Sequence, residues 1–159
     1  MRSTSVLLTA AAALAAASIT AAARPDAGPA QAGAPTGTLE LLEREGRARF
    51  VDHPPVGGRR RPPSLGDELV ITGVDRDPAT GARAGRSSMT CTLLGASGLD
   101  CRGTLVLRDG QIAVQGVAGD APPATVAVVG GTGRYAGARG TMTVTEAGDR
   151  ERVVISFLP

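Results

Sequence analysis

The stretch Val128–Gly140, which reads VVGGTGRYAGARG, decides the fold because it puts a cluster of glycines between two segments of strand character. Glycine has no Cβ and adopts backbone conformations closed to other residues, so the chain can turn tightly here and restart close to its neighbour. The segment is neither a dinucleotide loop nor a phosphate-binding loop, because it lacks the G-x-G-x-x-G spacing and no Gly-Lys-Ser/Thr follows. The structural motif of this turn is assigned to Gly130, Gly131, Thr132, Gly133 and Gly140.

Outward from this turn, the chain from Thr38 onward consists of short apolar runs separated by turn residues. This spacing favours a β-sandwich or a β-barrel over a helical fold. Each predicted strand is bounded by glycine, proline or acidic turn residues. We predict eight strands, at Thr38–Val51, Asp67–Val74, Ala82–Leu94, Asp100–Leu107, Gln111–Ala118, Ala124–Val129, Ala138–Thr145 and Glu151–Leu158.

The turns between these strands have recognisable chemistry. Asp77–Gly81 combines a proline, which presets φ, with a glycine that can take positive φ. Asp109-Gly110 is a strong hairpin signal. The predicted fold class is all-β, an eight-stranded antiparallel up-and-down barrel, which removes sheet edges and is just wide enough for one small ligand. A sandwich of two sheets fits the same periodicity almost as well.

The N-terminus has the pattern of an export signal. Met1–Ala23 contains one early charge, Arg2, then an apolar run and small residues that offer an A-x-A cleavage site. The alternative is a retained membrane anchor, but the apolar core is short and rich in alanine, and no second apolar segment follows. We therefore predict a signal peptide over 1–23, a flexible Ala/Pro/Gly linker over 24–36 and a β-barrel domain over 37–159, with secretion and no stable membrane span after cleavage.

The charge and the cysteines narrow the functional classes. Loss of Arg2 with the signal reduces the formal charge from +2 to +1, which gives no electrostatic case for nucleic acid as a partner. In an oxidising compartment, Cys91 and Cys101 suggest a disulfide across a hairpin, worth roughly 3 kcal/mol in the chain-entropy model. Two cysteines with the single histidine, His53, make a poor zinc site, so no metal is expected.

The glycine-rich stretch resembles the signature of the dirigent and allene oxide cyclase-like barrel superfamily, in which a GGTG-aromatic-ARG segment links two strands. The resemblance extends from about Leu39 to Leu158 and includes Gly66-Asp67 and the segment Gly110–Gly116. It is similar to secreted bacterial members with a cysteine pair in the central hairpin. The resemblance implies a calycin-like cup that forms a homo-oligomer, a dimer or trimer, and needs no cofactor. Its relatives guide radical coupling or cyclise reactive intermediates by holding a substrate in one conformation.

Three residues are candidates for catalysis under this resemblance. Arg139 matches the arginine of the ARG motif and is expected either to meet a substrate oxygen or to form a structural ion pair with Asp52 or Asp67. Asp52 ends the first strand and is either an acidic residue of the cup or a cap of the following turn. Tyr135 is either an active-site hydroxyl or a plug for the core.

Other charged residues have simpler interpretations. His53 is a possible general base, but a histidine beside prolines is mostly solvated. Arg59–Arg61 are candidates for binding anions, although three adjacent arginines in a proline-rich loop are more often solvated too. Neither set forms a recognisable catalytic motif.

Three functions follow from these observations. The first is a secreted dirigent-like barrel that binds a small apolar molecule and steers its cyclisation or coupling. The second is a lipocalin-like carrier, and the third is a structural module whose barrel is filled by its own side chains. A charged pair inside the cup favours the first, an all-apolar lining favours the second, and an interior with no room favours the third.

Overall fold

The computed structural model describes residues 33–53, 62–95, 98–119 and 121–159. The predicted signal peptide, 1–23, lies outside the described residues, and so does the predicted linker up to residue 32. Residues 33–36 have no regular secondary structure. Within the described ranges, no helix has the length and apolar character needed to cross a membrane.

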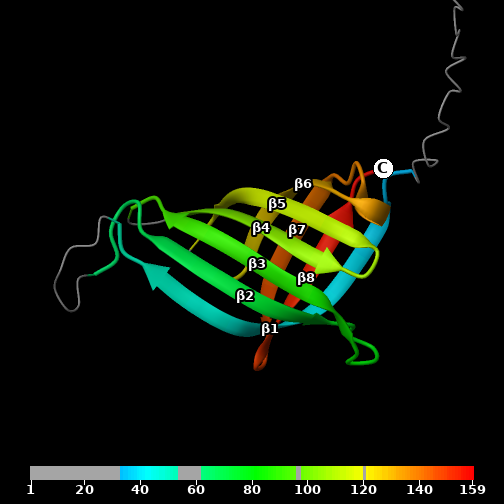
Figure 1. Cartoon of the computed structure of the whole chain (residues 1–159), viewed down its shortest axis with the longest axis horizontal. Helices are drawn as coiled ribbons and strands as arrows, with labels where there is room; N and C mark the ends of the chain where they lie inside the picture. Colours follow the sequence, from blue (N-terminus) through cyan, green and yellow to red (C-terminus); the bar gives the residue numbers. More distant parts are fainter. Residues whose placement is uncertain (1–32, 54–61, 96–97, 120) are drawn as a thin grey trace, which may run out of the picture. The chain divides into compact units, whose positions relative to one another are not determined.

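Eight antiparallel strands form a closed barrel in which each strand pairs with the next along the chain. The barrel closes because the first strand also pairs with the last, in register from Gly37 opposite Phe157 to Glu43 opposite Glu151. Figure 1 shows the cyan first strand running between the green second strand and the red last one. The strands are β1 (Gly37–Val51), β2 (Glu68–Arg76), β3 (Arg83–Leu93), β4 (Leu99–Leu107), β5 (Gly110–Ala118), β6 (Ala124–Gly131), β7 (Gly140–Ala147) and β8 (Arg150–Phe157).

This closed order confirms the predicted barrel and excludes the sandwich. All eight predicted strands are present, and their ends differ from the prediction by at most two residues. Both sides of the glycine-rich turn are shifted by two residues, since β6 continues to Gly131 and β7 starts only at Gly140. Gly130 and Gly131 still pair in extended conformation, opposite Ala113 and Ile112 of β5, so the turn begins two residues later than predicted.

The antiparallel order collects the loops at two ends of the barrel. The loops after β1, β3, β5 and β7 lie at one end, here called the disulfide end because Cys91 and Cys101 are close to it. The loops after β2, β4 and β6 lie at the opposite end, here called the glycine end.

The glycine end is closed by a short 3-10 helix, η1 (Gly133–Tyr135), between β6 and β7. Its Tyr135 is 8% exposed and stacks on Phe157, with 6.1 Å between ring centroids. The predicted location of the Tyr135 side chain in the core is therefore confirmed. Gly140 allows β7 to restart beside β8, since a Cβ there would lie 1.9 Å from the carbonyl oxygen of Ser156.

The core lies inside the barrel because alternate residues of each strand point inward. Its centre is made of aliphatic side chains that are almost completely buried. The most buried are Leu41, Leu105, Ile112, Val114, Val128, Ala138, Met142, Val153 and Ile155. These side chains fill the barrel toward the glycine end and leave a space toward the disulfide end.

Candidate functional site

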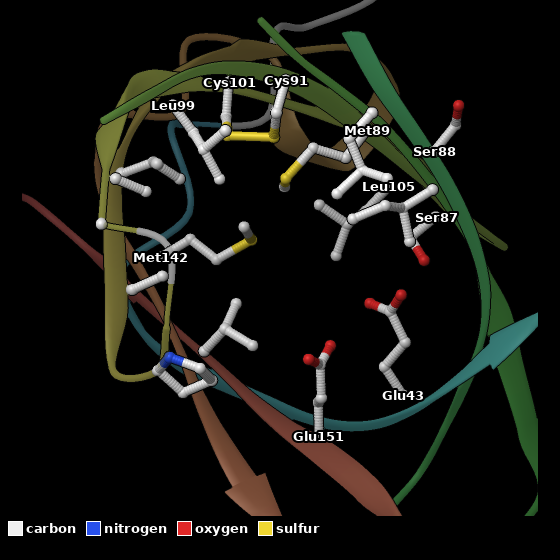
Figure 2. A pocket seen from close by; sticks show the side chains of 18 of the residues that line it. Glu43, Ser87, Ser88, Met89, Cys91, Leu99, Cys101, Leu105, Met142 and Glu151 are labelled. Atoms are coloured by element: carbon white, nitrogen blue, oxygen red, sulfur yellow. A yellow bond between two sulfur atoms is a disulfide. The ribbon is translucent and has the colours of Figure 1, made fainter. Parts of the chain in front are cut away.

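A cavity of about 200 Å³ occupies the interior of the barrel toward the disulfide end. Figure 2 looks into it and shows the thioether groups of Met89 and Met142 turned toward the centre. Further apolar lining comes from inward positions of five strands and from the loop between β5 and β6. These residues are Leu69, Ile71, Leu99, Leu105, Ala118, Ala121, Pro122, Ala124, Val126 and Val144.

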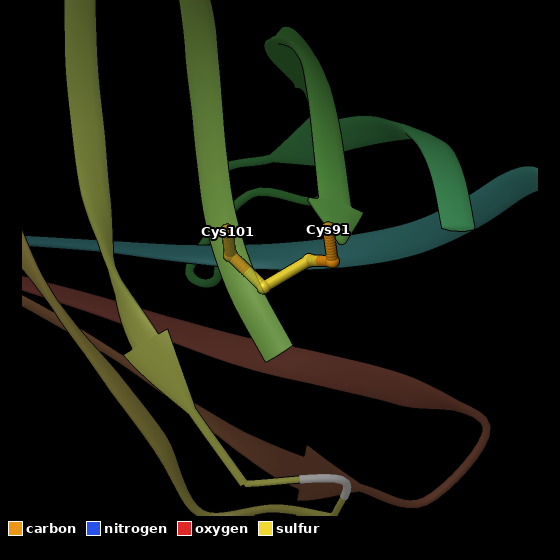
Figure 3. Close-up of a disulfide and its surroundings, with 2 residues drawn as sticks. All are labelled: Cys91 and Cys101. Atoms are coloured by element: carbon orange, nitrogen blue, oxygen red, sulfur yellow. A yellow bond between two sulfur atoms is a disulfide. The ribbon is translucent and has the colours of Figure 1, made fainter. Parts of the chain in front are cut away.

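The disulfide forms part of the cavity wall. Cys91 of β3 and Cys101 of β4 are directly opposite in the strand register, with sulfur atoms 2.09 Å apart. Figure 3 shows the bond bridging the two neighbouring strands on the inner face of the barrel. The predicted pairing is confirmed, and its sulfur atoms add polarizable apolar surface to the cavity.

Among the described residues, two carboxylates interrupt this apolar lining. Glu43 of β1 and Glu151 of β8 are paired in register, and both side chains project into the cavity from the same side (Figure 2). Neither was singled out from the sequence. The signal was available in the alternation, since Glu43 continues the inward series Leu39, Leu41 and Glu151 begins the inward series continued by Val153.

A third carboxylate, Asp75 of β2, lies in the barrel interior beside Glu43, its register partner on β1. Asp75 is 0% exposed, and burial raises its pKa to about 6, although a nearby Ser87 hydroxyl and the charge of Arg83 both act to lower it. Neither of its oxygens has a hydrogen-bond partner of ordinary geometry among the described residues. A large fraction of the Asp75 side chains is therefore protonated near pH 6.

Gly73 explains how polar groups gather at this level of the barrel. A Cβ on Gly73 would lie 2.0 Å from Oε1 of Glu43 and 2.6 Å from Oγ of Ser87. The carboxylate from β1 and the hydroxyl from β3 thus both reach over the backbone of β2. Ser87 also lines the cavity, and its buried hydroxyl has no hydrogen-bond partner among the described residues.

The predicted catalytic residues are not brought together. Arg139 is exposed at the glycine end, where its guanidinium donates hydrogen bonds of 2.9 Å to the carbonyl oxygens of Val129 and Ala138. The predicted alternative, an ion pair with Asp52 or Asp67, is replaced by these carbonyl contacts because the aspartates lie at the opposite end of the barrel. Asp52 follows β1 at the disulfide end but does not line the cavity.

Tyr135 lines a second hollow, of about 310 Å³, at the glycine end. Burial raises the pKa of its hydroxyl above the ordinary value. The lining includes side chains of both charges, Asp77, Arg83, Arg108 and Asp109, and Thr80 and Arg83 are exposed. This hollow therefore lies among the turns, separate from the cavity. Catalytic roles for Arg139, Asp52 and Tyr135 remain predictions.

Asp67 organises the chain at the entry into β2. Its carboxylate accepts hydrogen bonds from the backbone N–H of His53 at 2.9 Å and of Ser64 at 2.6 Å. These bonds lower the pKa of Asp67 below its ordinary value. The His53 ring lies 3.5 Å from a carboxylate oxygen of Glu68, with half of its side chain exposed. Arg59–Arg61 lie outside the described residues.

The part of the chain that the structure describes contains no cluster of side chains suited to binding a metal ion. No three His, Cys, Asp or Glu side chains there are close enough to hold an ion together. The site is thus a partly apolar cavity with acidic groups on one side, inside a closed β-barrel.

This combination of fold and cavity defines a small calycin-like barrel. Residues 60–158 match the family model described as the allene oxide cyclase barrel like domain. The match spans more than half of the chain, and the chain belongs to this family.

Several solved structures share the fold. The chain is similar to pyocyanin demethylase, with 22% identity and a TM-score of 0.66 over 76% of this chain and 99% of that one. It is similar to the pterocarpan synthase dirigent protein PsPTS1, with 15% identity and a TM-score of 0.56 over 77% and 95% of the two chains. It is also similar to the Diels Alderase AbmU from Streptomyces koyangensis, with 20% identity and a TM-score of 0.55 over 77% and 65%. No curated protein matches the sequence.

Proposed function

We propose that this protein is an exported barrel that binds a small, mostly apolar molecule in the cavity at the disulfide end and steers its cyclisation or coupling. The observation that carries the proposal is the cavity itself, about 200 Å³ with an apolar wall and two inward carboxylates. An engineered apolar cavity of about 150 Å³ holds benzene, so this space suits one ring or two fused rings. A barrel filled by its own side chains is not consistent with such a space.

The lining supports steering more than simple carriage. An apolar wall provides affinity, while polar groups at fixed positions select one orientation of the ligand. Glu43 and Glu151 stand on adjacent strands of the closed sheet, so their backbone positions are held by the β1–β8 ladder. Holding reacting atoms in one arrangement is sufficient to accelerate a cyclisation, because it removes orientational entropy before the reaction.

Export is supported by the signal-like pattern at the N-terminus and by the disulfide, since such bonds persist in oxidising compartments. Intact mass measurement of protein from the culture medium tests this part. We expect a chain that lacks residues 1–23, and a full-length chain in the cell fraction alone would contradict export.

The cavity is tested with a pair of neighbouring positions on β5. Ala118 is buried and lines the cavity, whereas Val117 is 63% exposed. We expect Ala118→Phe to fill the cavity and to abolish binding of 1-methylnaphthalene in a fluorescence titration. Val117→Phe adds a ring outside the barrel and should bind the probe like the unchanged protein. Equal binding by both variants would reject the cavity as the ligand site.

Steering is separated from carriage by native mass spectrometry of the protein with its co-purified small molecules. The molecule identified is then incubated with the Ala118→Phe and unchanged proteins and followed by liquid chromatography. A carrier releases the same molecule unaltered, whereas a steering barrel accelerates its conversion to one cyclised or coupled isomer. If the molecule is converted at equal rates with both proteins, the barrel does not steer the reaction and acts as a carrier.

A further inference from the structure

Three carboxylates on three adjacent strands are linked by the strand register on the inner face of the barrel. Asp75 of β2 is the register partner of Glu43 on β1, and Glu43 is the register partner of Glu151 on β8. These three side chains are here called the acidic row. Like charges on neighbouring strands repel, and a carboxylate removed from water is unfavourable unless an opposite charge or hydrogen bonds compensate it.

Asp75 is the member of the row for which this compensation is incomplete. It is 0% exposed, and both of its oxygens lack a hydrogen-bond partner in the described ranges. The hydroxyl of Ser87, which reaches the cavity from β3, lacks one too. The basic group that acts on Asp75 is Arg83, whose exposed side chain lines the hollow at the other end of the barrel.

Two members of the acidic row face the cavity, and Asp75 lies behind them, outside its lining. Glu43 and Glu151 line it directly, and they are the charged side chains among its described lining. Gly73 keeps the inner face of β2 bare between Asp75 and Ile71, and this leaves the space in which Glu43 and Ser87 approach each other. One side of the cavity is therefore negative, and the disulfide and the Met89 thioether lie on the opposite side, with the Met142 thioether between the two sides (Figure 2).

We propose that the cavity selects small organic cations, such as a fused aromatic ring with a protonated or quaternary nitrogen, whose charge lies against the acidic row. This inference rests on the proposed function and names its ligand class. The apolar body of such a ligand packs against the sulfur and aliphatic side chains, which are soft and adaptable. Its charge interacts with Glu43 and Glu151 at close range in a site of lower dielectric than water, where each pair is stronger than at the surface.

Two probes of the same shape test the inference. N-methylquinolinium and 1-methylnaphthalene differ in one ring atom, a positively charged nitrogen in place of a carbon. Binding of each probe is measured by fluorescence titration to the mature protein and to Glu43→Gln/Glu151→Gln. We expect the double variant to lose roughly tenfold or more in affinity for the cation and to bind 1-methylnaphthalene within about twofold of the unchanged protein.

A control variant removes two negative charges from the outside of the barrel. Glu40 pairs with Arg152 on the outer face, and the Asp149 side chain is 84% exposed. Glu40→Gln/Asp149→Asn matches the interior variant in net charge and should bind both probes within about twofold of the unchanged protein. Circular dichroism establishes that each variant is folded. If the interior double variant is not, Glu43→Gln and Glu151→Gln are measured singly, with an expected loss of roughly threefold each.

The outcomes separate the two proposals. If 1-methylnaphthalene binds but the cation does not, or if interior and exterior variants weaken the cation equally, selection of cations is overturned and the binding function stands. If neither probe binds, both proposals are overturned. A loss confined to the cation and to the interior variant supports the acidic row as its recognition site.

Discussion

Asp75 is the residue whose environment departs most from that of an ordinary apolar core. Burial raises its pKa from 3.8 to about 6, with Ser87 and Arg83 opposing that effect. Glu43 faces it from β1, and Gly85 is opposite it on β3. Because the folded-state pKa lies above the unfolded value, the folded protein holds this proton more tightly. Asp75 is therefore tolerated without cost below about pH 4 and destabilises the fold as the pH rises through about 6.

Asp75→Asn should therefore stabilise the barrel at neutral pH. We expect the free energy of unfolding at pH 7.5 to increase by about 1 to 3 kcal/mol, with no gain at pH 4, because the amide keeps the shape and does not ionise. Urea unfolding at both pH values measures the difference from the unchanged protein. A variant that follows the unchanged protein at every pH would contradict an uncompensated buried charge.

Asp77 provides a control of opposite sign. Its Oδ1 accepts hydrogen bonds from the backbone N–H groups of Ala79 and Thr80, and these bonds lower its pKa. The stabilisation from Asp77 is present above pH 3.8 and is lost as the pH falls through its lower folded-state pKa. Asp77→Asn should thus weaken the fold at pH 7.5, where Asp75→Asn strengthens it.

At the scale of one element, the turn between β6 and β7 shows why particular glycines are needed. Gly140 has φ of +151°, and a Cβ there would meet the carbonyl oxygen of Ser156 on β8. Gly81 in the turn between β2 and β3 also has positive φ, +68°, but nothing lies within 4 Å of its added Cβ. An alanine at Gly81 would therefore cause backbone strain alone, whereas an alanine at Gly140 would cause backbone strain and a clash with β8.

We expect Gly81→Ala to cost about 1 kcal/mol and Gly140→Ala at least about 3 kcal/mol in the free energy of unfolding. The larger value arises because the methyl group pushes β7 away from β8 as well as straining the backbone. Chemical denaturation of the two variants measures both costs. Equal costs would show that the strand pair adjusts to the methyl group.

The hairpin of β3 and β4 carries the disulfide, which encloses a sequence separation of 10 residues. Replacing both cysteines, as Cys91→Ala/Cys101→Ala, should lower the free energy of unfolding by about 2 to 3 kcal/mol, because the unfolded chain regains the freedom of that loop. The backbone pairing of the hairpin is unaffected, so the far-ultraviolet circular dichroism should be retained. The unchanged protein treated with reductant is expected to match the variant, and an unaltered denaturation midpoint in both would contradict this role.

At the scale of the whole barrel, closure decides which residues meet. Glu43 and Glu151 are far apart along the chain, and they become neighbours because β1 pairs with β8. Asp75 joins them because β1 pairs with β2 on its other edge. An open sheet with the same strands would separate the two edges and would enclose no cavity.

The assembly of the barrel is a further prediction at this scale. The resemblance to dirigent and cyclase-like barrels implies a dimer or trimer, and several large apolar side chains, among them Val117 and Val129, are exposed on the outer face. Size-exclusion chromatography with light scattering should give two or three times the mass of the mature chain. A monomer at all concentrations tested would contradict this prediction.

Much of the fold was predictable from the sequence because its determinants are local. Strand alternation, the Asp77–Gly81 turn, the Asp109-Gly110 hairpin and the pairing of Cys91 with Cys101 each depend on residues close together along the chain. The choice of a barrel over a sandwich was different, since it depends on whether the first and last strands pair. The resemblance carried by the glycine-rich turn favoured the barrel, but only the tertiary structure decided it.

The candidate site was decided by tertiary structure almost entirely. Arg139 and Tyr135 drew attention because they belong to a recognisable motif, yet that motif closes the end opposite the cavity. Glu43, Asp75 and Glu151 are acidic residues, and residues of this type usually face solvent. Their positions in the sequence determine that they share faces with apolar neighbours. Closure of the sheet turns those faces inward and places the three residues on adjacent strands, β8, β1 and β2.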